Sequence, residues 1–246
     1  MITVSGQQVQ VWAGTGKPGP LLFYWHGTGS VSAEAVWAIG QAQIDAITAA
    51  GGVVASFTTS TTQGTTTGNN VWYTGDFAMT DQILACAIQQ NRVDPCRVYS
   101  AGESAGGLQT TWMAYARSGY LAAAATISGG MTDAGGFILD PPPQDPTNIV
   151  PGMAIHGAAG MDVVVIDFAV ASAAWEADIA MRGGFSIDCN TQAGHATGPP
   201  EVSPAIWQFF EDHPFKIKPE PYKAPLPSIF PSYCVIGPRT KDGGAS

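Results

Sequence analysis

The stretch that decides the fold reads RVYSAGESAGG and occupies residues 97–107. Its first half is a short apolar run, which favours a buried strand. Its second half places Ser104 between glycines, and a segment with helical periodicity follows over residues 107–116. Glycines suit such a sharp strand-to-helix turn because a Cβ beside it would clash with the adjoining strand or helix. The stretch therefore predicts a serine on a strained turn, beside helix N–H groups that stabilise negative charge.

Strands and helices are predicted to alternate along the rest of the chain. Short apolar runs predict strands at residues 9–12, 21–25, 53–57, 97–100, 121–128, 153–156 and 185–189. Helical periodicity lies between them, over residues 33–50, 77–90, 107–116, 167–182 and 202–212. This alternation predicts an α/β fold, a three-layer sandwich in which helices cover both faces of a mostly parallel sheet.

Composition and charge argue against some classes of binding partner. The 246 residues include 10 Lys and Arg against 19 Asp and Glu, a formal charge of −9. No segment gathers the basic residues that nucleic acid or an anionic membrane surface requires, and no run of 18 apolar residues predicts a membrane span. We expect one domain over residues 1–246, since no repeat or linker divides the chain. The proline-rich tail 214–235 is expected to pack on the surface, and residues 242–246 to be disordered.

A nucleophilic serine needs a base, and the chain contains four histidines. His195 follows the last predicted strand, so it lies on a loop at the carboxyl edge of the sheet, where Ser104 is also expected. His26 and His156 stand at strand ends before glycines, and His213 follows an amphipathic helix. His195 is therefore the predicted base.

The base in turn needs a carboxylate that orients its ring and stabilises its charged form. Asp162 follows the strand at residues 153–156 and is the preferred candidate. Asp167 is its competitor, but it opens a helix and is read as an N-cap. Asp188 lies inside a strand, and Asp133 lies in a loop before a proline run. The resulting order of serine, aspartate and histidine is the one found in α/β-hydrolases.

Two backbone N–H groups are needed to stabilise an oxyanion beside the serine. One belongs to Ala105, the residue after the nucleophile. The other is expected from the turn after the strand at residues 21–25, where Thr28 is the preferred donor and Gly29 the alternative. The Thr-, Gly- and Asn-rich run 58–70 also follows a strand and is expected to border the site.

Aromatic residues near the same edge are candidates for substrate binding. They are Trp25, Trp72, Tyr73 and Phe57, whereas Trp112, Trp175 and Trp207 fit helix faces and are expected in the core. No metal-ligand cluster, phosphate loop or dinucleotide motif is present, so no metal and no cofactor is implied. No insertion is long enough for a helical lid, which favours an open site and polymeric esters.

These residues resemble a known family, the secreted serine esterases that include poly(3-hydroxybutyrate) depolymerases and feruloyl esterases. The resemblance spans roughly residues 20–235. It rests on WHGTG at 25–29, GESAGG at 102–107, HG at 156–157 with Asp162 beyond it, a cysteine and GH at 189–195, and FF with HP over 209–214. It implies the α/β-hydrolase fold without a lid domain and an acyl-enzyme on Ser104.

The four cysteines make an even set without a CxxC pair or a nearby histidine, which favours disulfides over zinc. Of three possible connectivities, Cys86–Cys96 with Cys189–Cys234 crosses the chain least and resembles the family's bridge near the catalytic histidine.

The sequence thus predicts an extracellular, monomeric carboxylic ester hydrolase acting on polyesters or on feruloyl or acetyl esters of plant cell walls. A peptidase of the same fold and a non-catalytic carbohydrate-binding or adhesion module are the alternatives.

Overall fold

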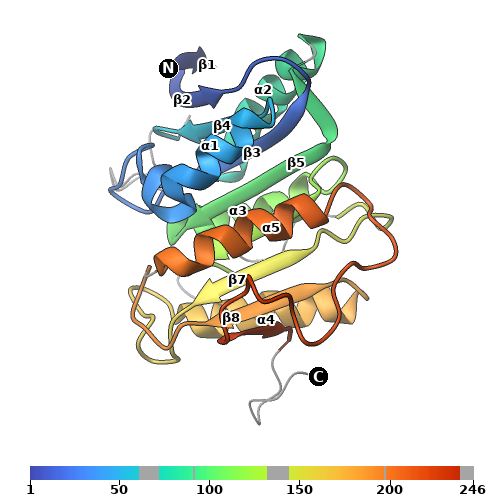
Figure 1. The fold of residues 1–246 in the computed structure, drawn as a ribbon. Coiled ribbons are helices and arrows are strands. Elements are labelled where there is room, and N and C mark those ends of the chain that lie inside the picture. The colour runs from blue at the N-terminus through green and yellow to red at the C-terminus, as the bar shows by residue number, and fades with distance from the viewer. Residues whose placement is uncertain (61–71, 91, 132–143, 197, 239–246) are drawn as a thin grey trace.

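The computed structural model describes residues 1–60, 72–90, 92–131, 144–196 and 198–238. Its central layer is a sheet of nine strands (Figure 1). Its strands are β1 (Ile2–Val4), β2 (Gln7–Ala13), β3 (Gly19–Trp25), β4 (Val53–Phe57), β5 (Val93–Glu103), β6 (Ala123–Ile127), β7 (Gly152–His156), β8 (Ser186–Asn190) and β9 (Cys234–Ile236). Their order across the sheet is β1-β2-β4-β3-β5-β6-β7-β8-β9. The six strands from β3 to β8 pair in parallel, while β1, β2 and β9 are antiparallel additions at the two sides.

Helices cover both faces of this sheet, so the predicted three-layer α/β fold is confirmed (Figure 1). The helices are α1 (Gln41–Ala49), α2 (Phe77–Gln89), α3 (Ala105–Ala116), α4 (Phe168–Met181) and α5 (Ser203–Asp212). One core cluster joins α1 and α5 to the sheet, and a second joins α2, α3 and α4. The central strands are apolar along their whole length because both of their faces are buried in these cores.

The local differences from the predicted elements have physical reasons. The pattern over residues 33–50 predicted one helix, but Gly40, with φ of 90°, divides it into a short π-helical turn (Val36–Gly40) and α1. Strands β1 and β9 were not predicted, since three residues are too few to show a period of two.

The tail contributes to the fold through one disulfide. Cys189 in β8 is bonded to Cys234 in β9, and the two strands pair at those residues. Tyr222 and Phe230 of the tail are buried in the first core cluster. Residues 242–246 lie outside the described residues.

The predicted Cys86–Cys96 bridge is wrong, because both are free cysteines with exposed side chains. The Cys86 sulfur accepts a hydrogen bond from the Gln90 amide at 3.1 Å. Cys96 lies where the pairing of β5 with β3 becomes irregular. Closeness in sequence did not bring the two sulfurs together, because each side chain points to solvent.

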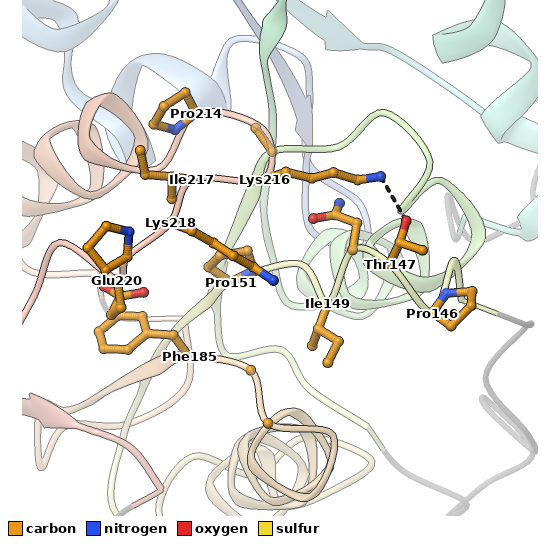
Figure 2. A pocket seen from close by; sticks show the side chains of 15 residues that line it. Pro146, Thr147, Ile149, Pro151, Phe185, Pro214, Lys216, Ile217, Lys218 and Glu220 are labelled. Atoms are coloured by element: carbon orange, nitrogen blue, oxygen red, sulfur yellow. Dashed lines mark hydrogen bonds between the residues drawn. The ribbon is translucent and has the colours of Figure 1, made fainter.

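A cavity of about 590 Å³ lies at the amino edge of the sheet, between the tail and the residues that precede β6, β7 and β8 (Figure 2). Pro151, Phe185 and Ile217 line it, and Lys216 crosses its rim to donate a hydrogen bond to Thr147 Oγ1 at 2.7 Å. Ser104 follows the carboxyl end of β5, so this cavity lies at the opposite edge of the sheet.

The described helices are all too short or too polar to span a membrane.

Candidate active site

Ser104 stands on a sharp turn between β5 and α3, as its flanking glycines predicted. Its φ of 56° and ψ of −118° lie outside the regions that a serine normally adopts, so the turn holds the residue in a strained conformation. The neighbouring backbone explains the glycines. A Cβ on Gly102 or on Gly106 would collide with the carbonyl oxygen of Trp25, the last residue of β3. The close approach of β3, β5 and α3 therefore leaves room only for glycine at these positions.

His195 joins Ser104 to Asp162 in one line of hydrogen bonds. Its Nε2 lies 2.9 Å from Ser104 Oγ, and its Nδ1 lies 2.8 Å from Asp162 Oδ1. The loops that follow β5, β7 and β8 bring the three residues to the carboxyl edge of the sheet. Phe168, the first residue of α4, packs against the imidazole with a ring-centroid distance of 4.6 Å. Packing and hydrogen bonding together fix the orientation of the ring.

Asp162 is fully buried, and three donors surround its carboxylate. Besides the bond with His195, its Oδ2 accepts hydrogen bonds from the Gly157 N–H at 2.8 Å and from the Ser128 hydroxyl at 2.9 Å. Burial raises the pKa of Asp162, but the hydrogen bonds from His195, Gly157 and Ser128 outweigh it, so the pKa lies below its ordinary value. The carboxylate therefore remains charged near neutral pH, where it accepts the hydrogen bond from His195 Nδ1.

Ser128 is a residue of this site that the sequence interpretation missed. It follows β6, has a φ of 48°, and is almost fully buried. Its hydroxyl donates to Asp162 and accepts a hydrogen bond from the Ala196 N–H at 2.9 Å. It therefore ties the acid to the residue after His195. The sequence interpretation missed this role because a serine after an isoleucine at the end of a predicted strand is too common a pair to indicate a site residue.

The other three histidines have their ring nitrogens engaged elsewhere. Those of His26 face the carbonyl oxygens of Gly27 and Thr58, and those of His156 face Gly157 O and Asp188. His213 contacts Phe209 O and Glu220 in the same way.

The competing aspartates are also accounted for. Asp167 accepts hydrogen bonds from the Ala169 and Val170 N–H groups and so caps α4, as its position before a helix predicted. Asp188 faces His156. Asp133 lies outside the described residues.

The turn after β3 lies against Ser104. The Ser30 N–H donates to Gly27 O at 3.1 Å and closes a tight turn, in which Gly29 has a φ of 74°. A Cβ built on Gly27 would lie 3.5 Å from Ser104 Cβ. Thr28 is the next residue of this turn, and Ala105 is the first residue of α3. The roles of Thr28 and Ala105 as oxyanion donors stay a prediction.

Two aromatic candidates for substrate binding prove to be core residues. Trp25 and Phe57 are fully buried and stack with ring centroids 4.0 Å apart, because both faces of β3 and β4 are covered. Trp72 is only 9% exposed, and its Nε1 donates to His26 O at 2.8 Å. Tyr73, with 41% of its surface exposed, is the candidate still open to a ligand. Residues 61–70 of the run expected to border the site lie outside the described residues.

Among the described residues, no group of three or more His, Cys, Asp or Glu side chains is placed to hold a metal ion.

Comparisons with known proteins agree with this architecture. Native pOPH superposes with a TM-score of 0.70 at 16% sequence identity, covering 96% of this chain and 92% of that chain. The carboxylesterase of Bacillus cereus gives a TM-score of 0.60 at 12% identity over 83% of this chain and 93% of its own. The acetyl xylan esterase of Aspergillus awamori gives 0.60 at 12% identity over 85% and 98%. No family model and no curated protein matches the sequence. At these identities the likeness establishes the fold alone, and the chain has the α/β-hydrolase fold.

Proposed function

We propose that this protein is a serine hydrolase that cleaves carboxylic esters through an acyl-enzyme on Ser104. The observation that carries the proposal is the unbroken line from Ser104 Oγ through His195 to Asp162, with contacts of 2.9 and 2.8 Å. A serine hydroxyl becomes a strong nucleophile only when a base accepts its proton. The fold of esterases such as that of Bacillus cereus supports the same reaction class.

The reaction follows from this geometry. Ser104 Oγ attacks the ester carbonyl while His195 Nε2 takes its proton, and Asp162 stabilises the imidazolium that forms. The negative oxygen of the tetrahedral intermediate is stabilised by the N–H groups of Ala105 and Thr28. His195 then gives its proton to the leaving alcohol, and the same residues activate water to release the acid.

The substrate class rests on the family resemblance. The motifs are those of esterases that act on polyhydroxyalkanoates or on feruloyl and acetyl esters of plant cell walls, and Tyr73 is proposed to contact such a substrate. A disulfide is typical of oxidising compartments and supports an extracellular location. We expect a monomer that acts without cofactor, membrane or nucleic acid.

The test is hydrolysis of a short p-nitrophenyl ester by the wild-type protein and by the Ser104→Ala and His195→Ala variants. Each variant should lower kcat by about 10⁴-fold, and the double variant should be little worse, because the two residues act as a unit. Ser118→Ala is the control, since this buried serine lies at the end of α3, away from the site. Full activity of Ser104→Ala would refute the proposal.

Substrate class is resolved by a panel of hydroxyalkanoate, feruloyl, acetyl-xylan and peptide substrates at matched concentration. Turnover of one of the esters without cleavage of any peptide separates the esterase from a peptidase. Absence of turnover on every member favours a binding module instead.

A further inference from the structure

The turn that carries Thr28 is held from behind by a buried carboxylate. Glu34 is only 6% exposed and lies seven residues after Gly27, where the helical segment that leads into Val36–Gly40 begins. Its Oε1 accepts hydrogen bonds from the Gly27 N–H at 3.0 Å and from the Tyr24 hydroxyl at 2.8 Å, and its Oε2 lies 3.2 Å from the same Gly27 nitrogen. Both oxygens are thus directed at the start of the turn and at β3.

This carboxylate is close to the reaction centre without reaching a substrate. A Cβ built on Gly27 would lie 3.6 Å from Glu34 Oε2 and 3.5 Å from Ser104 Cβ. Gly27 therefore separates Glu34 from the nucleophile by one backbone unit. The position of Gly27 also sets the peptide plane of Thr28, the next residue and the proposed second oxyanion donor.

Other contacts leave Gly27 dependent on Glu34. Trp72 fixes the preceding residue by donating to His26 O, and the turn closes through Gly27 O. The Gly27 N–H, in contrast, is directed at the Glu34 carboxylate. A single substitution at Glu34 can therefore weaken the hydrogen bond of the Gly27 N–H without touching the backbone.

Holding the turn with a buried carboxylate costs free energy. Burying charge costs free energy unless hydrogen bonds offset it, and a second carboxyl group, Glu103, lies nearby. The charge of Glu34 is met by two donors, Tyr24 and Gly27, rather than by a basic residue. A charged acceptor makes a stronger hydrogen bond to an N–H than a neutral one, so the arrangement gives the turn little freedom.

We propose that Glu34 is a positioning residue: it fixes Gly27 so that the Thr28 N–H meets the substrate oxyanion together with the Ala105 N–H. The inference rests on the proposed function. Because the oxyanion exists fully only in the transition state and intermediate, loss of Glu34 must reduce kcat more than it changes KM. A residue that served stability alone would lower the fraction of folded enzyme and leave kcat per active site unchanged.

The experiment compares Glu34→Ala, Glu34→Asp and Glu34→Gln with wild type on a soluble p-nitrophenyl ester, with active sites counted by burst titration. Glu34→Ala should lower kcat per titrated site by about 10- to 100-fold and change KM by less than about 2-fold, the size of effect seen when an oxyanion donor is weakened. Glu34→Gln should recover most of the activity, because its amide oxygen can accept the Gly27 hydrogen bond. Glu34→Asp keeps the charge but withdraws the carboxylate, so it should lose about 10-fold.

Ser32→Ala is the matched control. Ser32 is a buried residue shortly before Glu34 whose hydroxyl bonds to Gln10 rather than to the turn, so its removal should leave kcat unchanged. The proposal is overturned if kcat per titrated site stays within 2-fold of wild type in both Glu34→Ala and Glu34→Asp, or if Glu34→Gln is as poor as Glu34→Ala. If Glu34→Ala does not fold, Glu34→Asp and Glu34→Gln decide the matter. Failure of the proposed function is distinguishable, since the wild type would then show no turnover dependent on Ser104.

Discussion

Glu103, the residue before the nucleophile, should make the protein less stable as pH rises, and Glu103→Gln should remove this dependence. Burial and then the charge of Glu34 raise the pKa of Glu103 from 4.5 to about 8. The unfolded chain releases this proton near pH 4.5, whereas the folded protein holds it to about pH 8. The group's contribution is thus fully present below pH 4.5 and is lost progressively until pH passes 8.

The magnitude follows from the size of the shift. Each unit of pKa difference corresponds to about 1.4 kcal/mol, so the loss between pH 4.5 and 8 reaches roughly 5 kcal/mol at most, and less in proportion to the solvent that reaches Glu103. Glutamine does not titrate and mimics the protonated acid. The stability of Glu103→Gln relative to wild type should therefore improve by about 1 kcal/mol per pH unit from pH 5 to 8 and level off above.

Urea unfolding of both proteins at pH 5, 6, 7, 8 and 9 measures this difference directly. Glu211→Gln is the control, because the Glu211 side chain is 41% exposed and lies on the surface of α5. A constant offset between Glu103→Gln and wild type at all five pH values would refute the reasoning. The activity should agree: the variant should retain kcat at pH 7 and lose less of it than wild type above pH 8.

Three further changes test other parts of the site. Asp162→Asn should lower kcat about 10⁴-fold because it removes the charge opposite the imidazolium. Asp167→Asn should instead lower the free energy of unfolding by about 0.5–2 kcal/mol and keep kcat. Steady-state kinetics and thermal unfolding of both variants measure these effects. Cys234→Ser should lower the free energy of unfolding by about 4 kcal/mol in the loop-entropy model, and it should lower activity as well. Cys86→Ser should change neither quantity, and peptide mapping without reductant should find Cys86 free. Ser128→Ala should lower kcat about 10-fold or more by releasing Asp162 and the Ala196 N–H, with steady-state kinetics as the check.

The parts of the fold that could be predicted depend on short-range patterns. The glycines around Ser104 mark a turn that only glycine fits, and alternating apolar runs mark a parallel sheet. Once the sheet is parallel, the loops after its strands must meet at one edge, which is why His195 and Asp162 could be placed with Ser104 before any distance was known.

The parts that could not be predicted depend on contacts between distant segments. Whether a residue at a strand end faces a ligand or the core depends on the helices that cover the strand, so Trp25 was wrongly placed in the substrate site. The pairing of cysteines depends on which way each side chain points, so Cys86 and Cys96 were wrongly joined. Ser128 belongs to the site through two partners, Asp162 and Ala196, more than 30 residues away in sequence.

The carboxyl groups around Ser104 show why burial alone does not decide their roles. Asp162 is buried but receives hydrogen bonds from three donors, so its pKa falls and it keeps the charge that His195 needs. Glu103 is partly buried near Glu34, and desolvation and then the charge of Glu34 raise its pKa to about 8, so it holds a proton near neutral pH. Glu34 accepts hydrogen bonds from the Tyr24 hydroxyl and the Gly27 N–H. The neighbours of each carboxyl group thus determine whether it is a charged partner for the base, a protonated group beside the nucleophile or a hydrogen-bond acceptor for the turn. Moving the hydrogen-bond donors and charges that surround one carboxyl group to another should therefore exchange their roles, whereas exchanging Asp for Glu should not.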